Sequence, residues 1–270
     1  MVFSKINARG LVMLGCGKMG SALLSGWMAA GLDTGAVYVI DPAPSDWVIQ
    51  QGVRINAGLP ANPHVALIAV KPQMMQTALP TLAPLRDGKP LVISIAAGTP
   101  IATFERILGT DTRVIRAMPN TPAAIGKAIT AIIGNTATTP ADKTLADTLL
   151  STIGQVVHLQ HENDMDAVTA VSGSGPAYVF HMIEVLADAG VAQGLPKPLA
   201  LTLAKATVMG AGALAHETHE TPEHLRRAVT SPNGTTQAGL EVLMDATTGL
   251  APLMHRTVAA AAQRSRNLKT

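Results

Sequence analysis

The chain has 270 residues, of which 47% are hydrophobic and 14% are charged, and its formal net charge is +2 at pH 7. This composition argues against intrinsic disorder, and the small net charge argues against partners such as nucleic acid or a membrane surface. The single cysteine, Cys16, excludes an internal disulfide and is compatible with a reducing, cytoplasmic location.

The first half of the chain alternates short apolar runs with helical segments. We expect strands at Gly10–Leu14, Val37–Ile40, Val65–Val70, Leu91–Ser94, Arg113–Arg116 and Ala128–Ile133, with helices such as Ser21–Ala30 and Met75–Leu79 between them. The runs at 65–70 and 91–95 are apolar without alternation, which is typical of strands covered on both faces. The order of elements predicts an α/β fold with a doubly wound, mainly parallel sheet.

The second half of the chain becomes helical from about Asp164. Thr221-Pro222-Glu223 is typical of a helix start, with proline at the first helical position. The apolar stretch Pro198–Ala215 contains Lys205 and is rich in Ala and Gly, which favours a packed helix over a membrane span. We therefore expect two domains, an α/β domain at 1–162 and an all-α domain at 163–270. The low charge of the chain also predicts apolar surface buried between subunits.

A glycine-rich loop follows the first predicted strand. Gly15-Cys16-Gly17-Lys18-Met19-Gly20 has the G-x-G-x-x-G spacing and stands between a strand and a helix. In a Rossmann-type domain the first glycine makes the turn, the second admits a pyrophosphate and the third lets helix and strand pack closely. The alternative is a glycine-rich turn kept for packing. We interpret Cys16 as a small side chain that fills a gap, rather than as a redox group.

An acidic residue ends the second predicted strand. Asp41 lies about twenty residues beyond Gly20, where a carboxylate can bind the adenosine ribose 2′-OH. The alternative is an aspartate that only starts the Asp41-Pro42 turn.

Further polar or Gly/Pro-rich segments interrupt apolar structure where a ligand could approach the backbone. They are Ala69–Gln73, Met118–Pro122, Ser172–Ala177 and Ser231–Thr236, and the first two fall at the carboxyl edge of the predicted sheet, where open α/β sheets bind ligands. The histidines and acidic residues outside these segments lie in polar helix ends, so we predict no metal site.

Together these segments resemble the pyrroline-5-carboxylate reductase family over essentially the whole chain. The most specific part is Leu225–Leu243, with Ser231-Pro232 and Gly234-Thr235-Thr236 at its centre. The resemblance implies an enzyme that reduces 1-pyrroline-5-carboxylate to L-proline with NAD(P)H, the last step of proline biosynthesis. It also implies a helical domain that forms a homodimer, with dimers assembled into larger rings in some relatives.

The resemblance also implies roles for individual residues. Gly15, Gly17, Lys18, Met19 and Gly20 correspond to the pyrophosphate loop; Asn56, Ala69, Val70, Lys71 and Pro72 to the cofactor site; and Asn120 and Pro122 to the nicotinamide end. Ser231, Gly234 and Thr235 correspond to the loop that binds the substrate carboxylate. Thr236 corresponds to the catalytic residue whose hydroxyl meets the ring nitrogen.

Two positions depart from the family pattern. Asp41-Pro42-Ala43-Pro44 stands where many relatives carry a polar or basic group for an NADP phosphate, so we predict that NADH serves at least as well as NADPH. Arg54 or Lys18 would have to reach the phosphate for the opposite preference. Asn233 replaces a glycine of the substrate loop, and asparagine tolerates the left-handed conformation such a loop needs.

Two other functions stay open on the sequence alone. Another two-domain imine or β-hydroxyacid dehydrogenase would share the glycine loop, but it would need a proton donor such as a lysine in the helical domain. A non-catalytic dinucleotide-binding regulator would explain 15–20 and leave Ser231–Thr236 without a purpose.

Overall fold

The structure is a computed structural model that describes residues 2–268. The chain divides into two compact units, Met1–Ser174 with Ala261–Thr270, and Gly175–Ala260. The predicted boundary near Asn163 lies before this division. The intervening helical residues pack with the first unit, where Asn120 Nδ2 donates to the Ser172 carbonyl and Ser265 Oγ donates to Asp166. Helical character alone therefore does not assign a segment to the helical unit.

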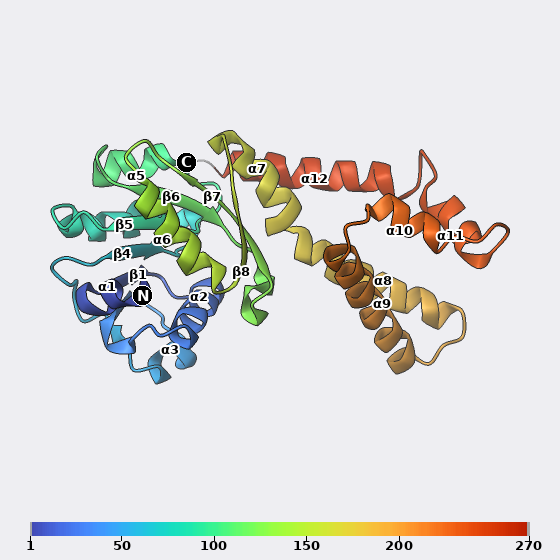
Figure 1. Cartoon of the computed structure of the whole chain (residues 1–270), viewed down its shortest axis with the longest axis horizontal. Coiled ribbons are helices and arrows are strands. Elements are labelled where there is room, and N and C mark those ends of the chain that lie inside the picture. Colours follow the sequence, from blue (N-terminus) through green and yellow to red (C-terminus); the bar gives the residue numbers. More distant parts are fainter. Residues whose placement is uncertain (1, 269–270) are drawn as a thin grey trace. The chain divides into compact units, whose positions relative to one another are not determined.

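The first unit contains an eight-stranded sheet in the order β3-β2-β1-β4-β5-β6-β7-β8 (Figure 1). The strands are β1 (Leu11–Leu14), β2 (Val37–Ile40), β3 (Arg54–Ile55), β4 (Val65–Ile68), β5 (Leu91–Ser94), β6 (Val114–Met118), β7 (Ala128–Gly134) and β8 (Gly154–His158). All neighbours pair in parallel except β6 and β7, which are antiparallel. The predicted doubly wound, mainly parallel α/β fold is confirmed.

Helices and helical turns connect these strands. They are α1 (Val2–Arg9), α2 (Lys18–Ala29), η1 (Thr34–Ala36), α3 (Asp46–Gln50), η2 (Pro72–Met74), α4 (Met75–Ala78), η3 (Leu79–Leu85), α5 (Ile101–Leu108), η4 (Thr121–Ile125), α6 (Pro140–Ser151), η5 (Glu162–Asp164), α7 (Met165–Val168) and the π-helical η6 (Thr169–Gly173). Because the parallel strands run the same way, the residues that follow β1, β2, β4 and β5 all emerge at one edge of the sheet.

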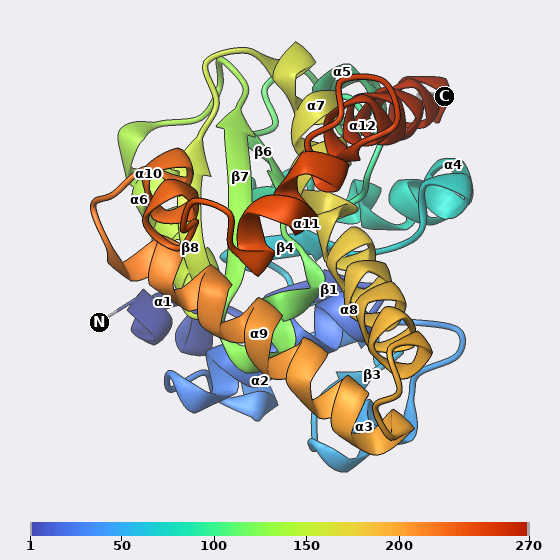
Figure 2. The ribbon, with the colours of Figure 1, turned by 90° about the vertical axis from the view of Figure 1, so that its right-hand side faces the viewer.

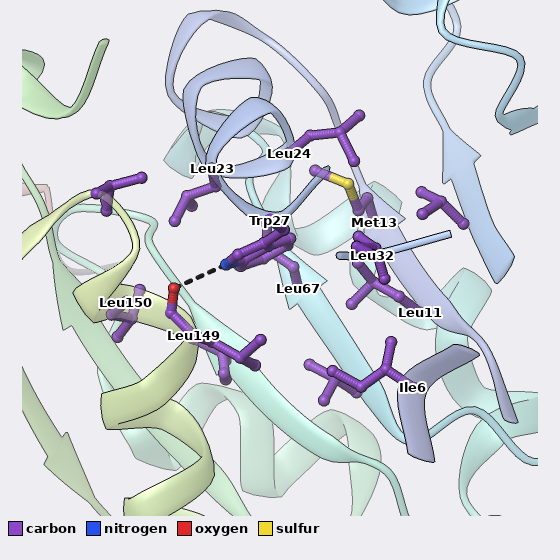
Figure 3. Close-up of a cluster of buried hydrophobic side chains, with 14 of the residues drawn as sticks. Ile6, Leu11, Met13, Leu23, Leu24, Trp27, Leu32, Leu67, Leu149 and Leu150 are labelled. Atoms are coloured by element: carbon purple, nitrogen blue, oxygen red, sulfur yellow. Dashed lines mark hydrogen bonds between the residues drawn. The ribbon is translucent and has the colours of Figure 1, made fainter. Parts of the chain in front are cut away.

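The central strands β1, β4 and β5 are buried on both faces, as the non-alternating apolar sequences of β4 and β5 predicted. Leu11 and Met13 of β1 join a core with α1, α2 and α6, whereas Val12 and Leu14 join a second core with α4, η3 and α5. Trp27 of α2 is fully buried, and its indole Nε1 donates a hydrogen bond of 2.8 Å to the Leu149 carbonyl of α6 (Figure 3). This bond satisfies the indole and fixes α2, whose first turn carries the glycine loop, against the sheet.

The described residues of the second unit form helices joined by turns and loops, with no strand. It comprises α8 (Gly175–Ala192), α9 (Lys197–Glu217), α10 (Pro222–Ala228), α11 (Thr235–Leu243) and the first part of α12 (Leu250–Asn267) (Figure 2). Alanines at 187, 200 and 204 form the small buried contact between α8 and α9. The predicted helix start at Pro222 is confirmed, and the Thr221 hydroxyl caps it by accepting from the His224 N–H.

The second unit exposes an apolar surface of unusual extent. Large apolar side chains at 199, 201, 203, 209 and 214 of α9 are exposed, and Met209 is 72% exposed. By length and composition α9 could cross a membrane, because its most apolar 18-residue segment has a mean hydropathy of 1.4. Only 11% of that segment is buried within the chain. The same properties suit a helix covered by another protein, because a lone soluble chain rarely leaves so much apolar surface in water.

Candidate active site

The glycine loop leaves β1 in a conformation that only glycine adopts easily. Gly15 has φ +82°, and its N–H donates to the Ile40 carbonyl of β2 at 2.8 Å. A Cβ placed on Gly15 would lie 2.9 Å from Val70 Cγ1, which is too close, and one on Gly20 would lie 3.4 Å from the Gly15 carbonyl oxygen. The turn and its close packing therefore require glycine at Gly15, whereas a Cβ on Gly20 would meet its neighbours at ordinary van der Waals distance.

Gly17 differs from the other two glycines of the loop, Gly15 and Gly20. Its φ of −72° and ψ of −164° suit any residue, and a Cβ on it would meet no atom within 4 Å. It is the N-cap of the 12-residue helix α2, and no side chain caps that helix. Neither backbone strain nor packing within the protein accounts for a glycine here.

The open space at Gly17 fits a dinucleotide pyrophosphate. The helix begins at Lys18, rather than near Ser21 as predicted, so the N–H groups of Lys18 and Met19 belong to its first turn. Such N–H groups and the helix dipole favour an anion, and the missing side chain leaves room for it to approach the backbone. Lys18 itself is exposed at this end of the helix.

Asp41 lies beside the glycine loop, immediately after β2. One carboxylate oxygen accepts from the Cys16 N–H at 2.8 Å and the other accepts from the Ala43 N–H at 2.9 Å. The bond with Ala43 closes the turn that begins at Asp41, as the alternative interpretation of this residue predicted. The contact with Cys16 goes further, because it joins the end of β2 to the loop at the end of β1. Each oxygen retains a second lone pair with which it can accept from a ribose hydroxyl.

Asn56 follows the two-residue strand β3 in a left-handed conformation, with φ 50°. Its side-chain amide accepts from the Asp41 N–H at 3.1 Å and donates to the Asp41 carbonyl at 2.8 Å. Asn56 was predicted to belong to the cofactor site, and these bonds with Asp41 were not predicted. The structure brings it against Asp41 by way of the backbone.

The end of β4 forms the other side of the glycine loop. The Ala69 N–H donates to the Leu14 carbonyl at 2.8 Å, and both Ala69 and Val70 contact the space where a Gly15 side chain would lie. Lys71 is exposed and caps η2, whose first residue is Pro72. The structure thus brings Ala69 and Val70 directly to the loop, and Lys71 and Pro72 follow them along the same edge.

Arg54 is held away from the carboxyl edge. Its guanidinium lies over the Tyr38 ring, 5.0 Å from the centroid, and Nη1 donates to the Tyr38 hydroxyl at 3.1 Å. The Tyr38 ring itself lies against Gly10, 3.4 Å from a Cβ built there, at the amino end of β1. Tyr38 therefore directs Arg54 toward the edge opposite Asp41.

Asn120 lies at the end of β6 and is 8% exposed. Its amide oxygen accepts from the Ile129 N–H at 3.0 Å, and its nitrogen donates to the Ser172 carbonyl at 3.1 Å. The neighbouring Met118 packs onto Gly173, where a Cβ would lie 2.5 Å from the methionine methyl group. Two segments that the sequence analysis selected separately are thus in contact. Pro122 continues from Asn120 within η4.

Cys16 is buried inside the loop and is 1% exposed. Burial raises the pKa of its thiol, and the negative charge of Asp41 adds to this effect, whereas a hydrogen bond with Ser21 opposes it. A thiol that stays protonated is a poor nucleophile. The structure therefore favours the predicted gap-filling role.

A buried ion pair near the carboxyl edge was not predicted from the sequence. Arg116 of β6 is buried and pairs with Glu162 at 2.5 Å, and the same Glu162 oxygen accepts from the Ile101 N–H at the start of α5. No spacing in the sequence links these positions. No group of three or more His, Cys, Asp or Glu side chains suited to a metal ion occurs within residues 2–268.

The predicted substrate loop lies in the second unit, apart in the chain from the glycine loop. Ser231 and Gly234 close a turn in which the Gly234 N–H donates to the Ser231 carbonyl at 3.0 Å. Asn233 has φ 58°, so the predicted left-handed asparagine is confirmed, and its N–H donates to the Gln237 side chain at 2.8 Å. The loop then leads directly into α11.

The first turn of α11 presents the groups that remain available. Thr235 and Thr236 are its first two residues, both are exposed, and Gly234 before them provides no side-chain cap. Within residues 2–268 the Thr236 hydroxyl makes no hydrogen bond. The Gly234 N–H is already used in the turn, so the N–H groups of Thr235 and Thr236 are better placed to bind a carboxylate.

Comparison with known proteins gives a consistent assignment for both units. A model of the family described as pyrroline-5-carboxylate reductase dimerisation matches residues 162–268, and one described as NADP oxidoreductase, coenzyme F420-dependent, matches residues 11–98. The pyrroline-5-carboxylate reductase of Methanosarcina acetivorans is 40% identical and covers 94% of this chain and 96% of its own. The corresponding protein of Pseudomonas aeruginosa is 37% identical and covers 96% of each chain.

Solved structures agree with this assignment. A pyrroline-5-carboxylate reductase from Coxiella burnetii has a TM-score of 0.88 at 31% identity, and covers 98% of this chain and 100% of its own. A pyrroline carboxylate reductase from Plasmodium falciparum, solved with NADP bound, has a TM-score of 0.87 at 28% identity. It covers 98% of this chain and 99% of its own. The resemblance inferred from the motifs is confirmed, and the chain belongs to the pyrroline-5-carboxylate reductase family.

Proposed function

We propose that this protein reduces 1-pyrroline-5-carboxylate to L-proline with NAD(P)H. The observation that carries the proposal is that one chain combines the open, uncapped start of α2 at Gly17 with a second uncapped helix start, where Thr235 and Thr236 of α11 are exposed. Relatives named for this activity match nearly the whole chain, and one of them was solved with NADP bound. The loop from Ser231 to Thr236 supplies the second half of the proposed site.

The first unit would hold the cofactor. The N–H groups at the start of α2 would bind the pyrophosphate, and the Asp41 carboxylate would accept from the adenosine ribose. When bound, the reduced nicotinamide supplies a hydride from its C4 atom to the imine carbon. Asn120 and Gly173 would shape the nicotinamide end through backbone contacts, because the Asn120 amide is already bonded to two backbone groups.

The second unit would hold the substrate. The Ser231 hydroxyl and the N–H groups of Thr235 and Thr236 would bind the carboxylate, and the Thr236 hydroxyl would meet the ring nitrogen. The segment from 231 to 236 contains no Asp, Glu, His or Lys. A protonated iminium is already electrophilic, so orientation by hydroxyl and amide groups can replace a strong general acid, and good orientation can lower a barrier by roughly 7–11 kcal/mol.

Oxidation of NADH and of NADPH with 1-pyrroline-5-carboxylate, followed side by side through the absorbance of the reduced cofactor, tests the proposal. L-Proline is the expected product. Dinucleotide binding without turnover of the imine would favour a regulator instead, and turnover only of other imines or of β-hydroxyacids would favour the other dehydrogenases.

Within this function we propose that NADH serves at least as well as NADPH. The 2′-phosphate of NADPH carries nearly two negative charges and would face the Asp41 carboxylate. At about 4 Å each charge pair repels by roughly 1 kcal/mol in water and roughly 4 kcal/mol at an effective dielectric near 20. The segment from Asp41 to Gln51 contains no Arg or Lys to offset this, and Arg54 is bound to Tyr38.

Replacing Asp41 by serine is expected to shift catalytic efficiency toward NADPH by about tenfold or more, the factor that ~1.4 kcal/mol of relieved repulsion produces. Steady-state kinetics with both cofactors measure the shift. Asp46→Ser, on the exposed start of α3, is the control and should leave the ratio unchanged. A wild-type enzyme that favoured NADPH tenfold would contradict the prediction and would point to Lys18 or Arg54 as the phosphate partner.

We further propose that the active form is a homodimer built through the helical unit, with dimers able to assemble into a larger ring. The exposed apolar face of α9 supports this, since obligate interfaces are strongly apolar and commonly bury more than roughly 2,000 Å². Light scattering at low micromolar concentration should give at least twice the mass of one chain. A stable, active monomer would rule out the obligate dimer.

The same proposal accounts for the surface of α9 without a bilayer. The second subunit would cover the apolar side chains, and the protein would be a cytoplasmic enzyme with no membrane or nucleic-acid partner. Recovery of the active enzyme in the soluble fraction after ultracentrifugation of a cell lysate, without detergent, is the expected result.

A further inference from the structure

We propose that Asn56 is a positioning residue that sets the cofactor preference by fixing Asp41 in place. The inference rests on the proposed function, because it concerns the cofactor of that reaction. Beyond the end of β3, the Asn56 side chain makes the hydrogen bonds to the Asp41 backbone that a further strand residue would make.

The amide of Asn56 continues the sheet beyond the end of β3. The strand has only two residues, and the Asn56 N–H still donates to the Val39 carbonyl at 2.8 Å, as a strand residue would. The side chain then supplies the next pair of bonds, accepting from the Asp41 N–H at 3.1 Å and donating to its carbonyl at 2.8 Å. The backbone of Asp41 is thereby held on both its donor and its acceptor.

The side chain of Asp41 is held from the opposite direction. Its two oxygens accept from the N–H groups of Cys16 and Ala43, so rotation of the carboxylate would break two hydrogen bonds. With its backbone held by Asn56 and its carboxylate held by the N–H groups of Cys16 and Ala43, Asp41 can turn away from an arriving 2′-phosphate only by breaking these hydrogen bonds.

The fixed position of Asp41 determines how strongly its charge discriminates between NADH and NADPH. A carboxylate on a loose chain end would move aside or rotate into solvent, and much of the repulsion would be lost to screening. A fixed carboxylate keeps both the repulsion toward a phosphate and its geometry toward a ribose hydroxyl. The preference for NADH therefore depends on Asn56 even though the charge belongs to Asp41.

The left-handed conformation of Asn56 decides which substitution tests this. Asn56→Gly keeps the φ of 50° without strain and removes both side-chain bonds to Asp41. Asn56→Ala removes the same bonds in a more strained backbone and serves as the second variant. Asn7→Ala is the matched control, because the Asn7 amide also donates to one backbone carbonyl and accepts from one backbone N–H, at Gly31 and Asp33.

The measurement is the ratio of NADH to NADPH dissociation constants, determined by titration of the purified full-length protein. Asn56→Gly should lower the preference for NADH by about fivefold, the factor that ~1 kcal/mol of lost hydrogen bonding produces. Asn56→Ala should act in the same direction. Asn7→Ala should lower the melting temperature without changing the ratio.

A double-variant cycle identifies the route of the effect. In an Asp41→Ser background, Asn56→Gly should no longer change the ratio, because no carboxylate remains to be positioned. An equal change in both backgrounds, or an unchanged ratio in the single variants, would overturn the inference. The titrations need no imine substrate, so a protein that bound dinucleotides in this way but never reduced 1-pyrroline-5-carboxylate would refute the proposed function alone.

Discussion

Gly17→Val is expected to weaken dinucleotide binding by at least about 100-fold, which corresponds to the ~2.7 kcal/mol of one or two hydrogen bonds to a charged group. The Cβ and its methyl groups would enter the space beside the first turn of α2 that is open in the structure. A pyrophosphate bound there would be pushed away from the N–H groups that attract it. The fold should tolerate the change, because the Gly17 backbone is extended and its Cβ meets no protein atom.

The combination of normal folding and lost binding is what separates a ligand site from a packing turn. Thermal unfolding without cofactor and titration with NADH should be measured on the same preparations. Ala29→Val, on the exposed far end of the same helix, controls for adding a β-branched residue to α2 and should bind NADH normally. Unchanged NADH affinity in Gly17→Val would show that the glycine-rich segment is a turn and no more.

Strands that depend on the residues of a single segment were predictable from the sequence. The six predicted strands all form, because their apolar side chains are buried in the two cores between the sheet and its helices. Strand β8 was not predicted, since it has only two apolar residues, and its Val157 is exposed at the sheet edge. Strand β3 was missed because two residues give no period to detect.

Contacts between distant segments could not be read from the sequence. The glycine spacing predicts a phosphate loop, but only the structure separates the close packing at Gly15 from the open space at Gly17. Asp41 was predicted from its place after a strand, whereas its bonds with Cys16 and Asn56 depend on the lateral order of three strands. The ion pair of Arg116 with Glu162 has the same origin.

Thr236→Ala is expected to lower turnover about 10- to 100-fold, the factor for losing ~1.4–2.7 kcal/mol of hydrogen bonding at the reacting nitrogen. The affinity for dinucleotides should change less than about twofold, because the groups proposed to bind the pyrophosphate and the ribose are the N–H groups of the glycine loop and the Asp41 carboxylate. The Thr236 hydroxyl is exposed and makes no hydrogen bond within residues 2–268, so its removal leaves no buried group unpaired. A loss of turnover would therefore reflect the substrate rather than the fold.

Two variants separate the hydroxyl from the rest of the side chain. Thr236→Ser keeps the hydroxyl at the first turn of α11 and should recover most of the wild-type turnover. Thr144→Ala removes an exposed hydroxyl from α6, where it bonds to the carbonyl of Pro140 in its own helix, and should leave turnover unchanged. If Thr236→Ala reduced the imine at the wild-type rate, the hydroxyl would have no part in the reaction. The positive charge of the iminium and the binding of its carboxylate by the α11 N–H groups would then have to provide the whole activation.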